Sequence, residues 1–441
     1  MMSPNHSLDR RHFLTRTGLM TVASSASLAA GAWGTFPSKS SAQSPPSHDD
    51  LPKIAFLGTV VRRHSHAQHF LDRHAMGYSW RGQWQPPRVK VASVYIDQFP
   101  DDDLAGDRIK RYGLKRYPSI SEALTLGGEE LAVDGVVLIG EHGDYPTNEK
   151  GQKRYPRYEW FKKIVSVFES CGRSVPVFND KHLSTDWAEC VEMVADSKRL
   201  GFPLLAGSSL PVTRRLPAIE MPHGAKLRES VCVAYGGVDS YDIHALETAQ
   251  CMSERWAGGE AGVSQVHALK GDNLWNRLAK NDCEVTRKLI VSALTRSHNL
   301  PVEGGFPTEV PSIDWLMRNY PETIGYVIEH LDGLRTSMLL TGIRDFNYAG
   351  MLDDGTIVSC QMYLPMPGHG STTADFFNPL VRHIEDTILT SKTPYPVERT
   401  LLTSGMVIAG VESLHLGQQP VATPYLDVAY SAPRESTFWL D

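Results

Sequence analysis

Short apolar runs alternate with amphipathic stretches between residues 51 and 215. The apolar runs are four to eight residues long and end at turn-forming residues, which is typical of buried strands. Each is followed by a stretch with apolar positions at helical spacing, so the segment predicts a parallel, doubly wound sheet. The predicted strands are residues 53–58, 89–96, 133–140, 175–178 and 203–207, and the predicted helices are residues 62–74, 103–112, 119–124, 158–170 and 186–200.

The pattern changes after residue 215, where predicted strands become longer and no longer alternate regularly with helices. Asp353-Asp354-Gly355 lies between two apolar segments and predicts an antiparallel hairpin. The chain is therefore expected to hold a Rossmann-like α/β domain at 51–215, followed by an α+β domain with a largely antiparallel open sheet at 216–441. In the second domain the predicted strands are residues 226–235, 263–269, 336–350 and 356–364, and the predicted helices are 241–255 and 397–416.

The N-terminus has the arrangement of a twin-arginine export signal. Arg10 and Arg11 precede a weakly apolar, Ala/Ser-rich run that is too short and too polar to span a membrane. Residues 1–42 are predicted to be the signal peptide, although Ala30-Gly31-Ala32 offers another cleavage site, and 43–50 is a Pro/Ser linker. We therefore expect the twin-arginine export machinery as a partner and a periplasmic or otherwise exported protein. No later apolar stretch predicts a membrane span in the mature chain.

Composition narrows the classes of function. Among 441 residues, 41% are hydrophobic and 21% charged, which are ordinary values for a globular protein. Lys and Arg total 44 against 50 Asp and Glu, a net charge of −6, so nucleic acid is not an expected partner. The six cysteines are scattered and lack the short spacings of a zinc or redox site, which predicts free buried thiols.

The first predicted strand leads into residues 58–63, Gly-Thr-Val-Val-Arg-Arg. Dinucleotide-binding folds carry G-x-G-x-x-G there, because glycines let the backbone approach a pyrophosphate at the next helix N-terminus. Only the first glycine is present. Either the dinucleotide site is weakened or lost, or an arginine pairs with the phosphate charge. Gly58, Thr59 and Val60 are the candidate cofactor contacts in this turn.

Asp97 stands at the end of the second predicted strand, where a carboxylate accepts the ribose hydroxyls of a nicotinamide dinucleotide. It follows Gly58 by 39 residues, against about 20 in the usual fingerprint. The Gly-, Trp- and Pro-rich stretch 76–87 accounts for the extra length. The alternative is an aspartate that begins a turn.

Charged residues also follow the next two buried strands. Glu141 and His142 come after the strand that ends near residue 140, and Asp180, Lys181 and His182 come after the strand at 175–178. The carboxyl ends of parallel strands meet at one edge of a sheet, where open α/β folds bind ligands. His142 and His182 are therefore candidates for one site, together with Asp144, Asp242 and His244.

A further segment, 236–244, ends in His244 and includes Asp239 and Asp242. Together with segment 208–214 and the strand ends above, it resembles the glucose-fructose oxidoreductase and inositol dehydrogenase (Gfo/Idh/MocA-like) family over most of the mature chain. Lys181 keeps the lysine of that family's Glu-Lys-Pro motif. His244 keeps the histidine of its Asp-x-Gly-x-His motif, whose aspartate is replaced by serine.

The resemblance implies hydride transfer between tightly bound NAD or NADP and a small carbohydrate or polyol. Residues 51–215 would bind the dinucleotide, and residues 216–441 would bind substrate and form a homo-oligomer. Lys181 and His244 would manage the proton of the reacting hydroxyl. The other implied contacts are Glu141, His142 and Asp180 to the cofactor, and Asp239 and Asp242 to the substrate.

Other interpretations stay open. The same fold without a working cofactor site would suit a carbohydrate-active lyase, hydrolase or epimerase, or a sugar-binding protein without catalysis. Lys181 could be a lysine at a strand end and His244 a histidine bonded to a nearby aspartate. A metal is not predicted, because ligand spacings such as His-x-x-x-His are absent. The candidates considered for it were His142, Asp144, His182, Asp242 and His244, with the same caution for His64, His66 and His69.

Overall fold

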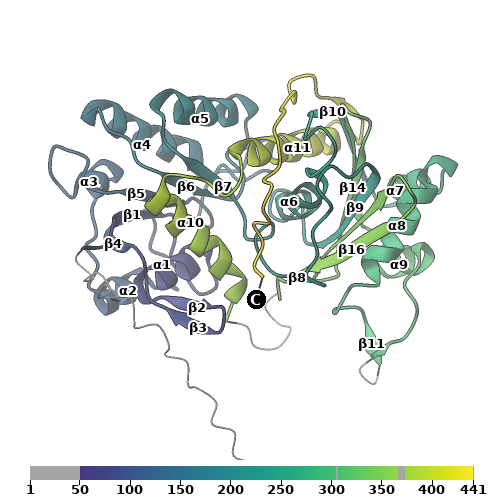
Figure 1. Ribbon diagram of the computed structural model, residues 1–441, viewed down its shortest axis with the longest axis horizontal. Helices are drawn as coiled ribbons and strands as arrows, with labels where there is room; N and C mark the ends of the chain where they lie inside the picture. The colour runs from purple at the N-terminus through teal and green to yellow at the C-terminus, as the bar shows by residue number, and fades with distance from the viewer. Residues whose placement is uncertain (1–49, 304–305, 366–372, 441) are drawn as a thin grey trace, which may run out of the picture. The chain divides into compact units, whose positions relative to one another are not determined.

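The computed structural model describes residues 50–303, 306–365 and 373–440 (Figure 1). The predicted signal peptide, nearly all of the linker and most of a Gly- and Pro-rich loop at 365–370 lie outside these ranges. None of the helices in the described ranges is long and apolar enough to cross a membrane. The six cysteines are free, and all except the half-buried Cys171 are buried.

The first half of the chain forms a five-stranded sheet in which every strand pair is parallel, with the order β4-β1-β5-β6-β7. Both faces are covered, so the strands are continuous apolar runs. Along β1, Ala55 and Leu57 face the core under α3 and α4, whereas Ile54 and Phe56 face the core under α1 and α10. The strands are β1 (Lys53–Gly58), β4 (Lys90–Ile96), β5 (Gly135–Ile139), β6 (Val177–Asp180) and β7 (Leu204–Gly207).

The predicted helices of this half are present, and their starts follow from capping side chains. Ser119 accepts a hydrogen bond from the Glu122 amide, and Asp186 accepts one from the Glu189 amide. The helix expected from residue 62 begins only at His66, because Ser65 caps it and stabilises a start at that point. The helices are α1 (His66–Met76), α2 (Ala105–Tyr112), α3 (Ile120–Thr125), α4 (Arg157–Cys171) and α5 (Trp187–Leu200).

The second half contains an eight-stranded sheet with the order β17-β10-β13-β14-β9-β15-β16-β8. Its pairs are antiparallel except β14 with β9, and β15 and β16 form the predicted hairpin. The single strand expected at 336–350 is two strands, because the chain turns at 342–345. The bounds are β8 (Arg215–Leu216), β9 (Leu227–Tyr235), β10 (Val263–Lys270), β13 (Ile324–His330), β14 (Arg335–Thr341), β15 (Phe346–Leu352), β16 (Ile357–Met362) and β17 (Val421–Ala422). Two small hairpins pair β2 (Tyr78–Trp80) with β3 (Gln83–Gln85), and β11 (Val302–Glu303) with β12 (Phe306–Pro307).

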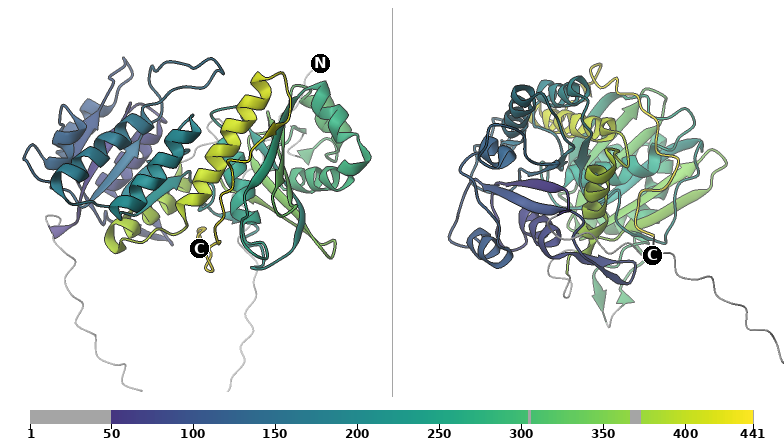
Figure 2. Two further views of the ribbon diagram at one scale, coloured as in Figure 1. Left: turned by 90° about the horizontal axis from the view of Figure 1, so that it is seen from above. Right: turned by 60° about the vertical axis from the view of Figure 1, so that its left-hand side comes forward.

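Helices cover both faces of this second sheet (Figure 2). The helices α6 (Asp242–Ser253) and α11 (Val397–His415) pack on one face, and α7 (Asp272–Leu278), α8 (Glu284–Leu294) and α9 (Ile313–Asn319) pack on the other. The helix α10 (Asn378–Thr390) returns to the parallel sheet, where Ile388 lies against Gly135.

The helix α11 joins the two sheets, because it packs against α5 and β7 as well as α6 and β10. Its approach to β13 depends on Gly410, since a Cβ atom at that position would lie 2.1 Å from the Tyr326 ring. The two halves therefore share one packed layer, and α6 is held next to the carboxyl ends of the parallel strands.

Candidate active site

The side chains predicted at the strand ends do come together. Glu141 follows β5, and Asp180 and Lys181 end and follow β6. His66 is the first residue of α1, the helix that follows β1, and β1 is the neighbour of β5 in the sheet. All four lie at the carboxyl edge of the parallel sheet, where this fold class binds ligands.

Lys181 and Glu141 form a buried ion pair through Nζ and Oε1, with the two residues 6% and 7% exposed. Burial alone would raise the pKa of Glu141, but Lys181 above all, and also His66, hold it well below its usual value. Lys181 has a φ of 62°, which is the left-handed region that lysine rarely adopts. Its amide donates to the Gly207 carbonyl at 3.1 Å, so a contact with β7 fixes this strained conformation.

His66 connects the two carboxyl groups. Its Nδ1 lies 2.7 Å from Asp180 Oδ2 and 3.5 Å from Glu141 Oε2. Asp180 is fully buried, whereas the His66 side chain is 16% exposed. The cluster therefore reaches solvent at His66 while its carboxyl groups remain inside.

Three further imidazoles surround the cluster and are neutral near pH 7. Burial lowers the pKa of His142 to about 4. Burial, with the nearby charge of Lys181, also lowers the pKa values of His182 and His244 well below the usual range. A neutral imidazole has a free lone pair that can accept a hydrogen bond, and the lowered pKa values make these groups weak bases. His182 Nε2 lies 3.1 Å from the Arg157 guanidinium.

The two aspartates predicted to contact substrate are engaged elsewhere. Asp239 accepts hydrogen bonds from the Lys153 amide at 2.9 Å and from Gln152 Nε2 at 3.3 Å. Asp242 is fully buried and accepts from the Tyr326 hydroxyl at 3.1 Å, and burial raises its pKa to about 7. Their role toward substrate stays a prediction.

The first turn provides a test of whether a dinucleotide fits. The β5–α4 loop, residues 140–156, runs from the end of β5 to the end of β4. There the Tyr145 hydroxyl donates to Asp97 Oδ2 at 2.6 Å, and Gln98 exchanges two hydrogen bonds with the Asp144 backbone, at 2.8 and 3.0 Å. Because β1 lies between β4 and β5, this loop crosses the end of β1.

The turn itself is also closed. The Thr59 amide donates to the Ile139 carbonyl at 3.2 Å, and the Gly58 and Thr59 carbonyls accept from the amides of residues 97 and 98. The Val60 side chain is buried and lies 3.1 Å from the position a Cβ atom would take on Gly143. Val60 and the β5–α4 loop therefore lie at the turn where dinucleotide-binding folds carry glycines, so this edge departs from the usual dinucleotide-binding turn.

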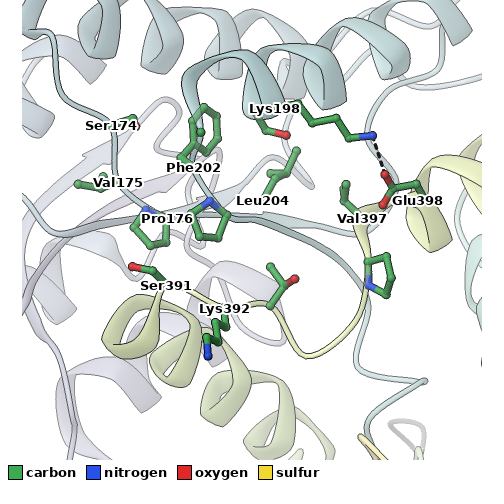
Figure 3. Close-up of a pocket in the computed structure, with 15 residues that line it drawn as sticks. Ser174, Val175, Pro176, Lys198, Phe202, Leu204, Ser391, Lys392, Val397 and Glu398 are labelled. Atoms are coloured by element: carbon green, nitrogen blue, oxygen red, sulfur yellow. Dashed lines mark ion pairs between the residues drawn. The ribbon is translucent and has the colours of Figure 1, made fainter. Parts of the chain in front are cut away.

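A separate hollow lies at the opposite edge of the parallel sheet, with a volume of about 710 Å³ (Figure 3). Residues just before β6 and β7 line it, together with Lys198 and Glu398, whose charged groups are 2.7 Å apart. It contains none of the predicted site residues.

Sequence reasoning gave His66 no role except as one of several uncertain histidines. The signal was nevertheless present, since Ser65 is a favourable N-cap. A helix that starts at residue 66 after the first strand places its first residue at the ligand-binding edge. Tyr145 and Gln98 were missed because a hydrogen bond between two loops leaves no periodic pattern.

No family model matches the chain, and no curated protein matches it. Its fold is nevertheless similar to solved dehydrogenases. A probable dehydrogenase from Thermotoga maritima has a TM-score of 0.52 at 11% identity, over 85% of this chain and 99% of that one. Myo-inositol dehydrogenase from Lactobacillus casei, solved with NAD(H) and myo-inositol, has a TM-score of 0.52 at 11% identity, over 88% and 99%.

GenD2 from gentamicin A biosynthesis, solved with NAD, has a TM-score of 0.51 at 12% identity, over 84% of this chain and 96% of that one. At such low identities these likenesses concern the fold. They confirm the predicted fold class, a Rossmann-like parallel sheet followed by a mostly antiparallel sheet, and show that dehydrogenases share it.

Proposed function

We propose that this protein is an enzyme that transfers protons on a sugar or polyol, of the lyase or epimerase class, without a dinucleotide cofactor. The observation that carries the proposal is the buried Lys181–Glu141 pair beside His66 and Asp180, at an edge where the β5–α4 loop is hydrogen-bonded to Asp97 and Gln98. The substrate class rests on the likeness to an inositol dehydrogenase solved with its polyol.

Two residues have complementary proton chemistry. The Lys181 ammonium, held against Glu141, is a proton donor. His244 is a neutral imidazole, and its Nδ1 lacks a hydrogen-bond partner among the described residues, so it is a proton acceptor. An acid and a base on opposite sides of a substrate carbon or hydroxyl are what such reactions require.

A second candidate function is hydride transfer with NAD or NADP. It is favoured by the fold shared with dehydrogenases that were solved with this cofactor. Gly58, Asp97 and the strand-end residues would then contact the dinucleotide, and the β5–α4 loop would have to move away from Asp97. Lys181 and His244 would handle the hydroxyl proton in this function too.

The test compares both functions in one experiment. The purified protein is incubated in D₂O with a panel of inositols, aldoses, ketoses and uronic acids, with and without NAD or NADP, and products and deuterium incorporation are followed by NMR. We expect turnover without added dinucleotide. In the folded Lys181→Met variant it should fall about 100-fold or more, but not in Lys110→Met, which changes an exposed lysine.

Two outcomes would contradict the proton-transfer proposal. A dinucleotide released from the acid-denatured protein in a one-to-one ratio, or turnover only after NAD or NADP is added, would overturn the proton-transfer proposal in favour of hydride transfer.

We also propose that the protein is exported by the twin-arginine route and acts outside the cytoplasm. The support is the sequence around Arg10 and Arg11. A homo-oligomer, inferred from the family resemblance, likewise remains a proposal that the oligomeric state in solution would test.

A further inference from the structure

We propose that His66, Glu141 and Asp180 bind a divalent transition-metal ion. One donor atom from each residue can be chosen so that all three lie within 4.8 Å of one another. An ion about 2.1 Å from each nitrogen or oxygen ligand places neighbouring ligands about 3.0 Å apart in octahedral and about 3.4 Å apart in tetrahedral coordination. The observed separations from His66 Nδ1, 2.7 Å to Asp180 Oδ2 and 3.5 Å to Glu141 Oε2, lie just below and just above this range.

Unpaired buried atoms are the second, independent observation. Asp180 is fully buried, yet its Oδ1 has no hydrogen-bond partner among the described residues, and neither does Oε2 of the 7% exposed Glu141. Leaving a buried carboxylate oxygen without a partner is costly. An ion bound by Glu141 Oε2 and by both carboxylate oxygens of Asp180 would satisfy the two unpaired atoms.

The surrounding charges are compatible with a cation. Two carboxyl groups face a single ammonium, that of Lys181, which binds Oε1 of Glu141 and leaves Oε2 directed to His66. A divalent ion can therefore bind on the side of Glu141 away from Lys181.

The ligand set also indicates the class of metal. Imidazole nitrogen favours zinc, iron and similar ions, whereas carboxylate oxygen also suits manganese. Three protein ligands leave coordination positions for water or for substrate hydroxyls. The side chains of His66 and His142, 16% and 26% exposed, mark where an ion and a polar ligand enter.

The experiment measures metal binding without a substrate. The purified protein is stripped with EDTA and dialysed against Zn²⁺ or Mn²⁺, and bound metal is quantified by mass spectrometry alongside the thermal unfolding midpoint. We expect one ion per chain and a higher midpoint with metal. His66→Gln and Asp180→Asn should each weaken binding at least tenfold.

The matched control is His64→Asn, which removes an exposed imidazole two residues from His66. Asparagine tolerates the positive φ of 65° at that position, so this variant should bind metal normally. If Asp180→Asn does not fold, the partly exposed His66 decides the matter. No binding by the stripped wild type, or equal binding by His66→Gln, would overturn the proposal.

This inference is separate from the proposed function. Metal binding without any turnover in D₂O would count against the proton-transfer function only. Turnover in a protein that binds no metal would count against the metal site only.

Discussion

The buried Lys181 and Glu141 side chains form an ion pair, and removing one partner destabilises the fold. Lys181→Met leaves Glu141 as a buried charge without its ammonium, so we expect a loss of about 3–5 kcal/mol of unfolding free energy. The double variant Lys181→Met/Glu141→Gln should recover part of that loss, because the unpaired charge is gone. Urea unfolding of the three proteins measures both effects, and equal stability of the single and double variants would contradict the coupling.

The buried pair of His330 and Glu260 predicts how the stability of the protein depends on pH. Its Nδ1 lies 3.1 Å from Glu260 Oε1. Burial opposes protonation of His330, but the charge and hydrogen bond of Glu260 outweigh it and raise the pKa. A raised folded-state pKa means that this stabilisation is fully present below the unfolded value of about 6.5 and is lost as pH rises through the folded value.

His330→Gln should therefore destabilise the protein more at pH 6 than at pH 9. At pH 6 the wild type has a charge-assisted hydrogen bond worth about 1.5–3 kcal/mol. Urea unfolding of both proteins at the two pH values measures the difference. The same loss at both would mean that His330 is neutral throughout.

The sequence indicated the position of some site residues but not of others. Glu141, His142, Asp180 and Lys181 were grouped by the family resemblance, and they meet because parallel strands end at the same edge. The predicted helix at 241–255 already places Asp242 and His244 about 200° apart, but which of them faces the site depends on how that helix packs. Asp242 accordingly bonds to Tyr326 in the core, and His244 lies near the site.

At the scale of elements, the β5–α4 loop separates this fold from an open dinucleotide-binding site. Gln98 accepts from the Asp144 amide and donates to its carbonyl. In Gln98→Ala we expect the amides of residues 142–145 to exchange with deuterium about tenfold faster, because two hydrogen bonds are lost. Mass spectrometry of exchanged peptides measures this.

The matched variant is Gln98→Glu, which keeps the acceptor for the Asp144 amide and loses the donor. It should exchange at an intermediate rate. Unchanged exchange in Gln98→Ala would show that other contacts hold the loop.

Strands and helices with strong local signals were predicted well. The buried strands of the first sheet and the helices capped by Ser119 and Asp186 are examples. Elements whose structure depends on segments far away in the sequence were predicted less well. Residues 336–350 were predicted as one strand but form two, β14 and β15. The turn between them is needed because β14 pairs with β9 in parallel and β15 pairs with β9 antiparallel. The helix α10 packs on a sheet formed some 200 residues earlier.

For the whole molecule, the coverage of the second sheet bears on assembly. The family resemblance suggested oligomerisation through an open sheet face, but α7, α8 and α9 cover that face here. Val231 and Val233 of β9 are buried beneath them. A homo-oligomer would therefore need a different surface, such as the outer sides of these helices or a sheet edge.

The whole chain also has to reach its compartment, and the paired arginines make this testable. Arg10→Lys/Arg11→Lys keeps the charge of the signal and removes both guanidinium groups, so an effect of charge alone is excluded. In a host with a twin-arginine system we expect the variant to keep its signal and remain in the cytoplasm, as shown by cell fractionation and mass. Arg16→Lys, a change outside the pair, should be exported normally. Equal export of the double variant and the wild type would show that the paired arginines are not read, and the proposed location would lose its support.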